Sequence, residues 1–420
     1  MKYFFSVFFS SALFLINVPP AAAETSVKIL YIQPNPEVVN IWKQTAADFE
    51  KLHPGVKIEF SFLENEAFKD KLPTLMQSND IPSAYHSWGG GILFEQIRAG
   101  MCKDITPWID PNLKNSFFAG GIDDFTYEGK VFGIPNLVAP WVVWYNKKLC
   151  QKAGVDPTQI HDWNNFVEAI KKCLAAGIVP VAVGGKEKWP LHLYTTALML
   201  RLAGHEGVAD AVAGKNGGLA GPDFVEAFQL FQQFCALNPF QPGYLARSYP
   251  EAAGYFREGK AAFHFMGSWD LQLGPLNSAD QKGIPEDDIG WIQFPLVKGG
   301  KGTADELLAN LEGWATTRAA NKETVEFLEY WMSKDPQTKL AAGGYYIPMA
   351  KGTVDVIKDP LQKDMATLAQ NAKSLSLAMN IILGTDVGNV FIDATTDVAA
   401  GKVKPEDAAK QIEQAWRSSQ

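Results

Sequence analysis

The N-terminal part of the chain alternates between extended and helical hydrophobic patterns. Residues 26–32 (SVKILYI) predict a strand, and apolar positions within residues 38–52 recur at spacings of three and four, which predicts a helix. Residues 53–55 (HPG) end that helix, and residues 56–63 (VKIEFSFL) predict the next strand. The order strand, helix, strand indicates a βαβ unit in a protein of the α/β class.

The rest of the chain continues this alternation. Asp162 is suited to cap a helix, and the last helix is expected to begin near Pro405. Helices are predicted over residues 163–174, 191–202, 224–236 and 321–331, and extended segments over residues 83–88, 132–136, 141–146, 179–185, 261–266, 289–295 and 311–317.

Aromatic side chains recur at the ends of the predicted strands, mixed with carboxylates and amides. Open α/β sheets bind ligands beyond the carboxyl ends of their strands, so the residues that follow each strand are candidate ligand contacts. These candidates are Glu64, Trp88, Asn136, Trp144, Trp189, Trp269, Asp270, Glu312, Trp314 and Tyr345.

This mixture suits a carbohydrate, which has an apolar C–H face and a rim of hydroxyl groups. A flat Trp or Tyr ring buries the C–H face at low entropic cost, and carboxylates form charge-assisted hydrogen bonds with the rim. Any single Trp can instead belong to the core. Trp42, Trp163, Trp331 and Trp416 lie on apolar helix faces and are assigned there, whereas Trp88, Trp189, Trp269 and Trp314 are mostly flanked by glycine or turn residues.

Composition narrows the function further. The chain has 420 residues and a net charge of -8, so it carries no basic excess with which to bind nucleic acid or an anionic lipid surface. Six histidines are few for a metalloenzyme, and no nucleotide-binding or hydrolase motif is present, so no metal or other cofactor is predicted. His86 and His264 fall in predicted strands and are interpreted as core or polar-contact residues.

The first residues predict export. Lys2 precedes an uncharged apolar run over residues 3–18, two prolines break it, and three alanines stand before Glu24. This is the pattern of a secretory signal peptide cleaved between Ala23 and Glu24, which predicts a periplasmic protein. A membrane anchor is the alternative, but the run is short for a span of about 20 residues.

The four cysteines leave two readings open. They form no CxxC pair and fit no zinc-binding spacing. Cys150 and Cys173 fall on neighbouring predicted helices and could form a disulfide in an exported protein, or all four could be free thiols.

Several motifs, in this order, resemble the extracellular solute-binding proteins of ABC sugar importers, the group that contains maltose-binding protein. Besides the signal segment, they are FEKLHPGVKIEF (49–60), FGIPN (132–136) with VVWYNKKLCQKAGVD (142–156), DWNNFVEAIKK (162–172), FREGKAAFHFMGSWD (256–270), and GWATTRAANKETVEFLEYW (313–331) before YYIP (345–348).

The resemblance implies a two-lobed periplasmic-binding-protein fold of type II, with a ligand cleft between lobes that are joined by a hinge. It places lobe one at residues 24–137 plus 287–337 and lobe two at residues 138–286 plus 338–420. The implied protein captures a mono- or oligosaccharide by hinge closure and delivers it to the membrane permease subunits of an importer. A monomer without catalytic activity is expected.

Two alternatives remain. The same fold could bind a non-sugar solute such as a polyamine or a polyol phosphate, or the protein could be a secreted enzyme that acts on glycans. A glycosidase would need two carboxylates at a defined separation, which a sequence cannot supply. The role of Asp270 also stays open between a contact with the sugar rim and a cap for the following helix.

Overall fold

The computed structural model describes residues 25–118, 121–344 and 346–420. The predicted signal segment, residues 1–23, lies outside the described residues, as does Tyr345. Within the described ranges, no helix combines the length and the apolarity that crossing a membrane requires.

A mixed sheet forms the centre of the molecule. Its main path follows the order β10-β6-β9-β3-β1-β2; β7 and β8 also pair with β6, and β11 with β9. β1 pairs in parallel with β2 and β3, whereas β9 is antiparallel to β3 and β6. The strands in the described residues are β1 Thr25–Tyr31, β2 Val56–Phe62, β3 Ala84–Ser87, β4 Thr126–Tyr127, β5 Lys130–Val131, β6 Gly133–Asn146, β7 Phe263–Gly267, β8 Ile289–Gln293, β9 Glu306–Thr316, β10 Ile347–Pro348 and β11 Ser374–Ser376.

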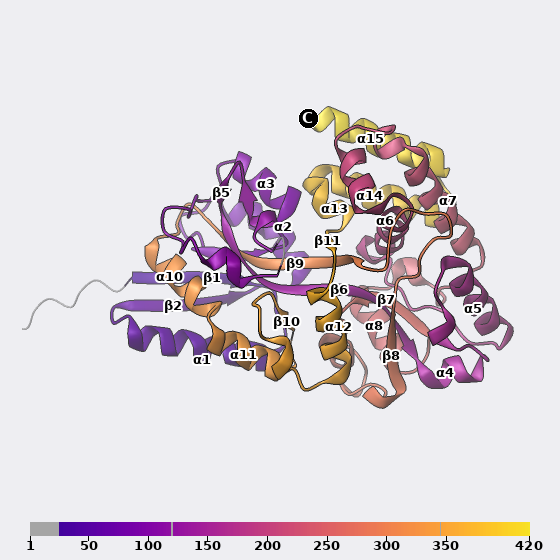
Figure 1. The fold of residues 1–420 in the computed structure, drawn as a ribbon, viewed down its shortest axis with the longest axis horizontal. Coiled ribbons are helices and arrows are strands. Elements are labelled where there is room, and N and C mark those ends of the chain that lie inside the picture. The colour runs from indigo at the N-terminus through magenta and orange to yellow at the C-terminus, as the bar shows by residue number, and fades with distance from the viewer. Residues whose placement is uncertain (1–24, 119–120, 345) are drawn as a thin grey trace, which may run out of the picture.

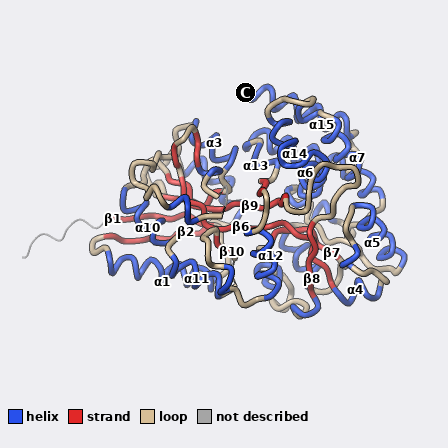
Figure 2. Tube along the Cα trace, in the orientation of Figure 1, coloured by secondary structure: helices blue, strands red, loops and turns tan. Residues whose placement is uncertain are grey.

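Helices cover the sheet on both sides of its long central strands. Figure 1 shows β6 and β9 running side by side across the middle of the molecule, with helices gathered around each end, and Figure 2 shows the same division by element type. The helices are α1 Pro36–Leu52, α2 Asn65–Leu75, α3 Gly90–Arg98, α4 Lys147–Lys152, α5 Trp163–Ala175, α6 Trp189–Val212, α7 Pro222–Ala236, α8 Tyr249–Arg257, α9 Asp270–Leu276, α10 Lys322–Trp331, α11 Lys334–Ala342, α12 Pro360–Gln370, α13 Met379–Ile382, α14 Gly384–Ala399 and α15 Pro405–Ser419.

The molecule therefore has two halves. The first half contains β1–β3 with α1–α3, α10 and α11, and the second contains β7 and β8 with α4–α9, α14 and α15. The lobe boundary that we predict at residues 137/138 falls inside β6, and the one at 337/338 falls inside α11, which packs against α1. The division of the chain at these residues stays a prediction.

Local sequence explains where the helices begin. Asn35 accepts a hydrogen bond from the backbone N–H of Glu37 at the start of α1, and Pro36 occupies the first helical position. Asp162 caps α5 as predicted, and it forms a reciprocal capping box with Asn165. Trp42, Trp163 and Trp331 are buried on their helices, as expected, and the partly buried Trp416 donates from Nε1 to the carbonyl of Val212.

Two expectations for the strands need correction. The extended segments predicted over residues 132–136 and 141–146 belong to one continuous strand, β6, whose register shifts between Pro135 and Leu137. The strand predicted over residues 179–185 is absent, and only Val181 forms isolated bridges. At Val183 the side-chain amide of Gln241 stands in for a backbone partner, because it donates to the carbonyl at 2.6 Å and accepts from the N–H at 2.9 Å.

All four cysteines are free thiols in the structure. Cys150 and Cys173 are buried, and burial raises the pKa of the Cys173 thiol to about 11. The disulfide that the sequence allowed between them is therefore not formed.

Candidate functional site

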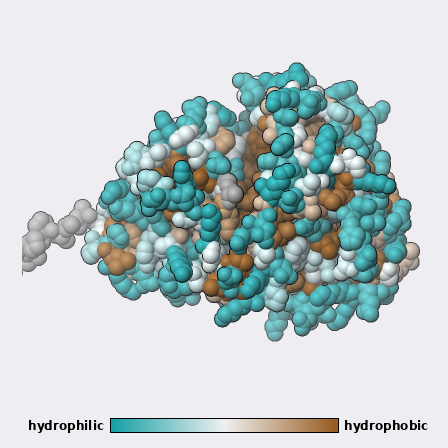
Figure 3. All heavy atoms as spheres, in the orientation of Figure 1, coloured by the Kyte–Doolittle hydropathy of each residue, from teal (hydrophilic) through white to brown (hydrophobic). Residues whose placement is uncertain are grey.

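A cleft of about 1430 Å³ lies between the two halves of the molecule. The ends of β1, β2 and β3 and the start of α3 line one side, α6, α8 and α9 line the other, and β6 and β9 pass between them. Figure 3 shows hydrophobic residues gathered near the junction of the two halves, while hydrophilic residues cover most of the rest of that face. This is the position that the strand-end argument indicates for a ligand.

The cleft brings together most of the candidate residues from the sequence, although they come from segments far apart in the chain. Trp144 and Asp270 do not line it, because both are fully buried in the second half. Tyr345 cannot be placed, since it lies outside the described residues. The candidates that line the cleft are Glu64, Trp88, Asn136, Trp189, Trp269, Glu312 and Trp314.

Trp144 was expected near the end of an extended run, and β6 does end two residues later, at Asn146, but this end of the strand is covered. Trp144 lies inside β6, paired with His264 on β7 and with Trp291 on β8, so neighbouring strands cover both edges of its backbone. Its Nε1 lies 3.4 Å from the carbonyl oxygen of Gly267, and the Arg257 guanidinium lies over its ring. Trp144 is therefore not among the residues that could contact a ligand in the cleft, contrary to the prediction from the sequence.

On the first-half side, the cleft is formed by His86, Trp88, Glu312 and Trp314, which we call the first wall. The Trp88 ring lies edge-on to His86, with ring centres 4.8 Å apart, and Phe68 supports it from 5.9 Å. The Trp88 side chain is half-buried, so part of its ring is available to a ligand. Lys69 places its ammonium 5.6 Å from the ring centre.

Glu312 is the titratable group of the first wall. Burial raises the pKa of its carboxyl to about 7, and the side-chain amide of Asn310, 3.4 Å away, opposes this rise only partly. Its Oε2 lies 3.7 Å from His86 Nε2. Burial lowers the pKa of His86 to about 3, so the imidazole is neutral at physiological pH and does not form an ion pair with Glu312.

Asn136 and Trp314 face the cleft but also hold the core beneath it. The Asn136 Oδ1 accepts hydrogen bonds from Trp331 Nε1 at 3.1 Å and from the Tyr346 hydroxyl at 3.2 Å. Trp314 is only 2% exposed and packs against Trp42 and Trp331, with ring centres 5.6 and 5.2 Å away. Both residues therefore contribute more to the packing between β6, β9 and α10 than to open surface.

On the opposite side, the cleft is formed by Trp189, Tyr249 and Trp269, which we call the second wall. The Trp189 and Tyr249 rings lie 5.2 Å apart at 51°. Trp269 stands on the turn after β7 and folds back over Gly267, where a Cβ atom would lie 2.0 Å from the indole ring. Glycine is required at that position because any side chain would displace the ring.

Several buried polar atoms that line the cleft have no hydrogen-bond partner within the described residues. They include the indole Nε1 atoms of Trp189 and Trp314 and the Nε2 atom of His86. A buried donor without a partner costs about 1–3 kcal/mol. These atoms are closed to solvent here, so the hydroxyl of a ligand could satisfy them only after the side chain turns toward the cleft.

Glu64 lines the cleft and also caps the N-terminus of α2. It precedes α2, and its carboxylate accepts hydrogen bonds from the backbone N–H groups of Glu66 and Ala67 at 2.9 and 3.4 Å. This interaction satisfies two backbone N–H groups at the start of the helix. Glu64 remains exposed at the rim, where a ligand could share the carboxylate.

Two contacts join the halves on either side of the cleft. The Glu95 carboxylate on α3 accepts a hydrogen bond from the backbone N–H of Thr385, in the first turn of α14, at 2.7 Å. Elsewhere, the side-chain amide of Gln272 on α9 donates to the carbonyl of Gly344. Both contacts cross from one half to the other, so they hold the halves close together in this conformation.

Sequence reasoning missed several cleft residues. His192, which lines the cleft from α6, and Trp141, which lines it from β6, lie inside regular elements rather than after a strand. Asn310 lies in β9, where its Oδ1 accepts from Trp141 Nε1 at 3.2 Å. Tyr249 had a signal in the sequence, because the capping box of Ser248 and Glu251 marks the start of α8 and places Tyr249 at its first position.

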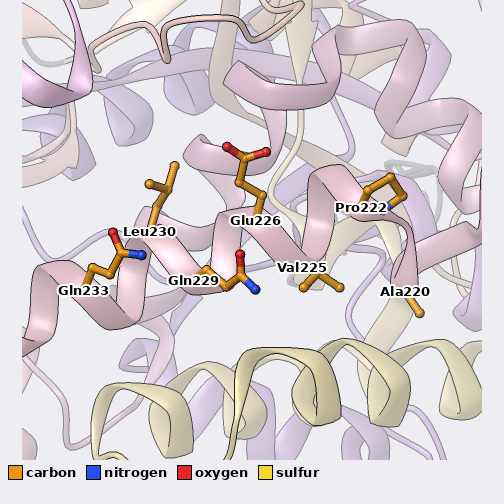
Figure 4. Close-up of a pocket in the computed structure, with 7 residues that line it drawn as sticks. All are labelled: Ala220, Pro222, Val225, Glu226, Gln229, Leu230 and Gln233. Carbon is orange, nitrogen blue, oxygen red and sulfur yellow. The ribbon is translucent and has the colours of Figure 1, made fainter.

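No group of three or more His, Cys, Asp and Glu side chains within the described residues is arranged to hold a metal ion. Figure 4 shows a second hollow, of about 630 Å³, along α7. It is lined by side chains of α7 and the turn before it, namely Ala220, Pro222, Val225, Glu226, Gln229, Leu230 and Gln233, and it lacks aromatic rings.

Comparison with known proteins places the chain in a family. An uncharacterised ABC transporter extracellular-binding protein of Pyrococcus horikoshii is 22% identical over 87% of this chain and 80% of its own. A multiple sugar-binding protein of Streptococcus mutans is 24% identical over 73% of this chain and 71% of its own.

A solved structure, described in work on xylan utilization by the thermophilic bacterium Caldanaerobius polysaccharolyticus, superposes with a TM-score of 0.83 at 26% identity. The superposition covers 93% of this chain and 99% of that one. It confirms the predicted α/β, two-lobed fold of type II. Residues 35–338 match the sequence model of one family, and the chain therefore belongs to the bacterial extracellular solute-binding proteins.

Proposed function

We propose that this protein is the periplasmic sugar-binding component of an ABC importer, which captures a mono- or oligosaccharide between its halves and presents it to membrane permease subunits. The family is extracellular and binds solutes. A multiple sugar-binding protein is among its relatives, which supports a carbohydrate as the solute. Export through the N-terminal signal segment and a monomeric state are part of the proposal.

The facing aromatic walls are the observation that carries the proposal. Trp88 on one side and Trp189 and Trp269 on the other present partly buried rings to one cleft, with Glu312 near its floor. Flat rings cover the C–H faces of sugar units, and the carboxyl of Glu312 can donate or accept a hydrogen bond, since its pKa of about 7 leaves both forms populated at neutral pH. The cleft is large enough to take more than one sugar unit.

A titration of intrinsic Trp fluorescence tests the proposal. Purified protein without residues 1–23 is titrated with galactose, maltotriose, xylotriose, N,N′-diacetylchitobiose and sorbitol, and each response is checked by calorimetry. We expect at least one saccharide to change the emission and to bind with micromolar affinity, which corresponds to about -8 kcal/mol. Absence of any saccharide response in both measurements would refute a sugar-binding role.

A matched variant shows where the signal arises. Trp269→Phe is expected to reduce the fluorescence response, because Trp269 lines the cleft. Trp108→Phe is the control, since Trp108 is also half-buried but does not line the cleft. Equal responses in the two variants would show that the emission change does not report on this site.

A cationic solute is the second candidate, and the charge of the cleft favours it. Seven carboxylates line the cleft against two lysines, and each lysine already pairs with one of these acids, Lys69 with Glu66 and Lys188 with Asp393. Spermidine therefore belongs in the panel, and binding of spermidine without any saccharide would favour a polyamine-binding protein. We expect no turnover of a bound sugar, and hydrolysis on prolonged incubation would instead support a glycan-acting enzyme.

A further inference from the structure

Behind the second wall lies a cluster of titratable side chains that has no access to solvent. Arg257, His264 and Asp270 are each 0% exposed. Burying ionised groups is costly unless they are paired, and replacing a buried ion pair with apolar residues is often neutral or stabilising. The cluster therefore calls for an explanation other than stability.

Asp270 is the centre of the cluster. Its Oδ1 accepts a hydrogen bond from the Tyr249 hydroxyl at 3.0 Å and lies 3.8 Å from His264 Nε2, while its Oδ2 lies 4.0 Å from Arg257 Nε. Arg257 also donates from Nη2 to the Asp270 carbonyl at 2.7 Å. Burial alone would raise the pKa of Asp270, but His264, Arg257 and Tyr249 outweigh it and keep the pKa below its usual value.

His264 is fixed on its other side as well. Its Nδ1 lies 2.8 Å from the carbonyl of Ala182, and its ring stacks on Phe256. The group that Asp270 reaches most directly is consequently Tyr249, with which it shares the only hydrogen bond under 3.5 Å among the described partners of its carboxylate.

Tyr249 connects this buried cluster with the cleft. It lines the cleft itself, and its ring contacts the Trp189 ring at 5.2 Å. Burial raises the pKa of the Tyr249 hydroxyl well above its usual value, and a hydrogen bond with the Trp269 side chain opposes part of this rise. The backbone N–H of Tyr249 donates to Glu187 at 2.9 Å, which ties α8 to the segment that precedes Trp189.

Trp269 is held from its other side by the backbone. The ring folds over Gly267, and the backbone N–H of the intervening Ser268 donates to the carbonyl of Pro140 in β6 at 2.8 Å. Asp270 is the next residue and the first of α9, so the same residue that binds the Tyr249 hydroxyl also fixes the backbone from which the Trp269 ring projects.

We propose that Asp270 and Tyr249 are positioning residues for the ligand: the buried carboxylate holds the Tyr249 hydroxyl, and Tyr249 holds the rings of Trp189 and Trp269 at the angle that receives a sugar. The inference rests on the proposed function for the identity of the ligand. It assigns Asp270 neither of the roles that the sequence allowed, since the side chain is too buried to meet a sugar and forms no capping bond to α9.

The first test needs no saccharide. Tyr249→Phe keeps the ring and removes only the hydroxyl, and Asp270→Asn removes the charge. Acrylamide quenching of Trp emission is measured for both variants and for Tyr255→Phe, a half-buried tyrosine on the same helix that does not line the cleft. We expect quenching above the wild-type value in the first two variants and a wild-type value in Tyr255→Phe.

The source of the extra quenching is then located. The increase caused by Tyr249→Phe should disappear when Trp189 and Trp269 are both replaced by Phe. Unchanged quenching in Tyr249→Phe, or an equal increase in Tyr255→Phe, would overturn the positioning role. Asp270→Asn leaves Arg257 buried without its counter-charge and can lower the yield of folded protein, but Tyr249→Phe still decides the question.

The second test measures affinity. For a panel saccharide that binds the wild type, Tyr249→Phe is expected to weaken binding about tenfold while the melting temperature falls by less than about 5 °C. A fall in melting temperature with unchanged affinity would reduce Tyr249 to a structural residue. If no panel saccharide binds the wild type, the proposed function fails, and the acrylamide measurement still decides whether the rings are positioned by Tyr249.

Discussion

On the first wall of the cleft, Trp88 rests on the rings of Phe68 and His86, whereas on the second wall Trp189 and Trp269 stand in front of the buried charge of Asp270. The first wall has its carboxyl group, Glu312, facing the cleft, whereas the carboxylate of Asp270 lies behind the rings of the second wall. Similar aromatic surfaces are thus supported by apolar packing on one side and by a polar network on the other.

The contrast shows that the orientation of a ring at a binding site depends on the residues packed behind it as well as on its place in the fold. Packing fixes a ring through many weak contacts. A hydrogen bond to a buried charge fixes a ring through one strong and directional contact. The two walls should therefore respond differently to substitution and to pH. Four experiments test this difference.

The largest effect is expected on folding, at the base of the first wall. Trp314→Ala should lower the free energy of unfolding by about 3–5 kcal/mol, because the removed ring is buried against Trp42 and Trp331 and leaves a cavity. Denaturant titration measures the change. Trp88→Ala is the matched control, and a similar loss in that half-buried position would mean that the first wall is core throughout.

A pH effect of intermediate size is expected from Glu312. Its folded pKa of about 7 lies above the ordinary value of 4.5, so the folded protein keeps a proton that the unfolded chain releases. The stability contributed by this group is complete below about pH 4.5 and is lost as the pH rises to about 7, with a slope of up to about 1.4 kcal/mol per pH unit.

His86 opposes this dependence over part of the range. Its folded pKa of about 3 lies below the ordinary 6.5, so its contribution is complete above about pH 6.5 and is lost as the pH falls. The informative quantity is therefore the difference between the wild type and Glu312→Gln, measured by denaturant titration at several pH values. A difference that is independent of pH between 4.5 and 7 would contradict the assignment, and Glu226→Gln, an exposed acid on α7, serves as the control.

Binding should respond next, at the second wall. Trp269→Ala is expected to weaken saccharide binding by at least about tenfold, or about 1.4 kcal/mol, while unfolding stays cooperative. Calorimetry measures the affinity, with Trp108→Ala as the control outside the cleft. Unchanged affinity would show that Trp269 contributes to packing alone and that its ring in the second wall does not bind the saccharide.

The smallest effect is expected where the halves meet. Glu95→Gln weakens the acceptor for the Thr385 N–H at the start of α14, which should cost about 0.3–1 kcal/mol and shift the protein toward a more open form. Small-angle scattering without ligand measures the shift. Asp386→Asn removes an exposed charge from the same helix turn, and an equal shift in that variant would rule out a bridging role for Glu95.

The sequence predicted the fold well because its strongest signals are local. The helix after Asp162 and the apolar faces that carry Trp42 and Trp331 needed only short-range periodicity and capping chemistry. The predicted strand at residues 179–185 is reduced to two isolated bridges of Val181, to Phe240 and Phe263, because at Val183 the side chain of Gln241 takes both backbone hydrogen bonds. No local sequence pattern predicts a hydrogen bond between residues as far apart in the chain as Val183 and Gln241.

The site was only partly predictable, for a related reason. The rule that ligand contacts follow strands placed Trp88 and Trp269 at the cleft, because their strands end there. Trp144 looked equivalent, since β6 ends two residues later, but β7 and β8 pair with this end of β6 and the ring is fully buried. The strand is buried on both faces, so no alternation of polar and apolar residues reveals which strand end is covered. Asp270 follows Trp269 directly, and only the three-dimensional structure shows that it points away from the cleft.

The position of β9 in the sheet has a consequence for how the chain is made. β9 lies between β6 and β3 in the sheet, but it comes about 220 residues after β3 in the chain. A chain that leaves the ribosome from its N-terminus must therefore synthesise most of its length before β3 can gain its second neighbour. Contacts this far apart in sequence form slowly, so the architecture itself delays completion of the fold until most of the chain is available.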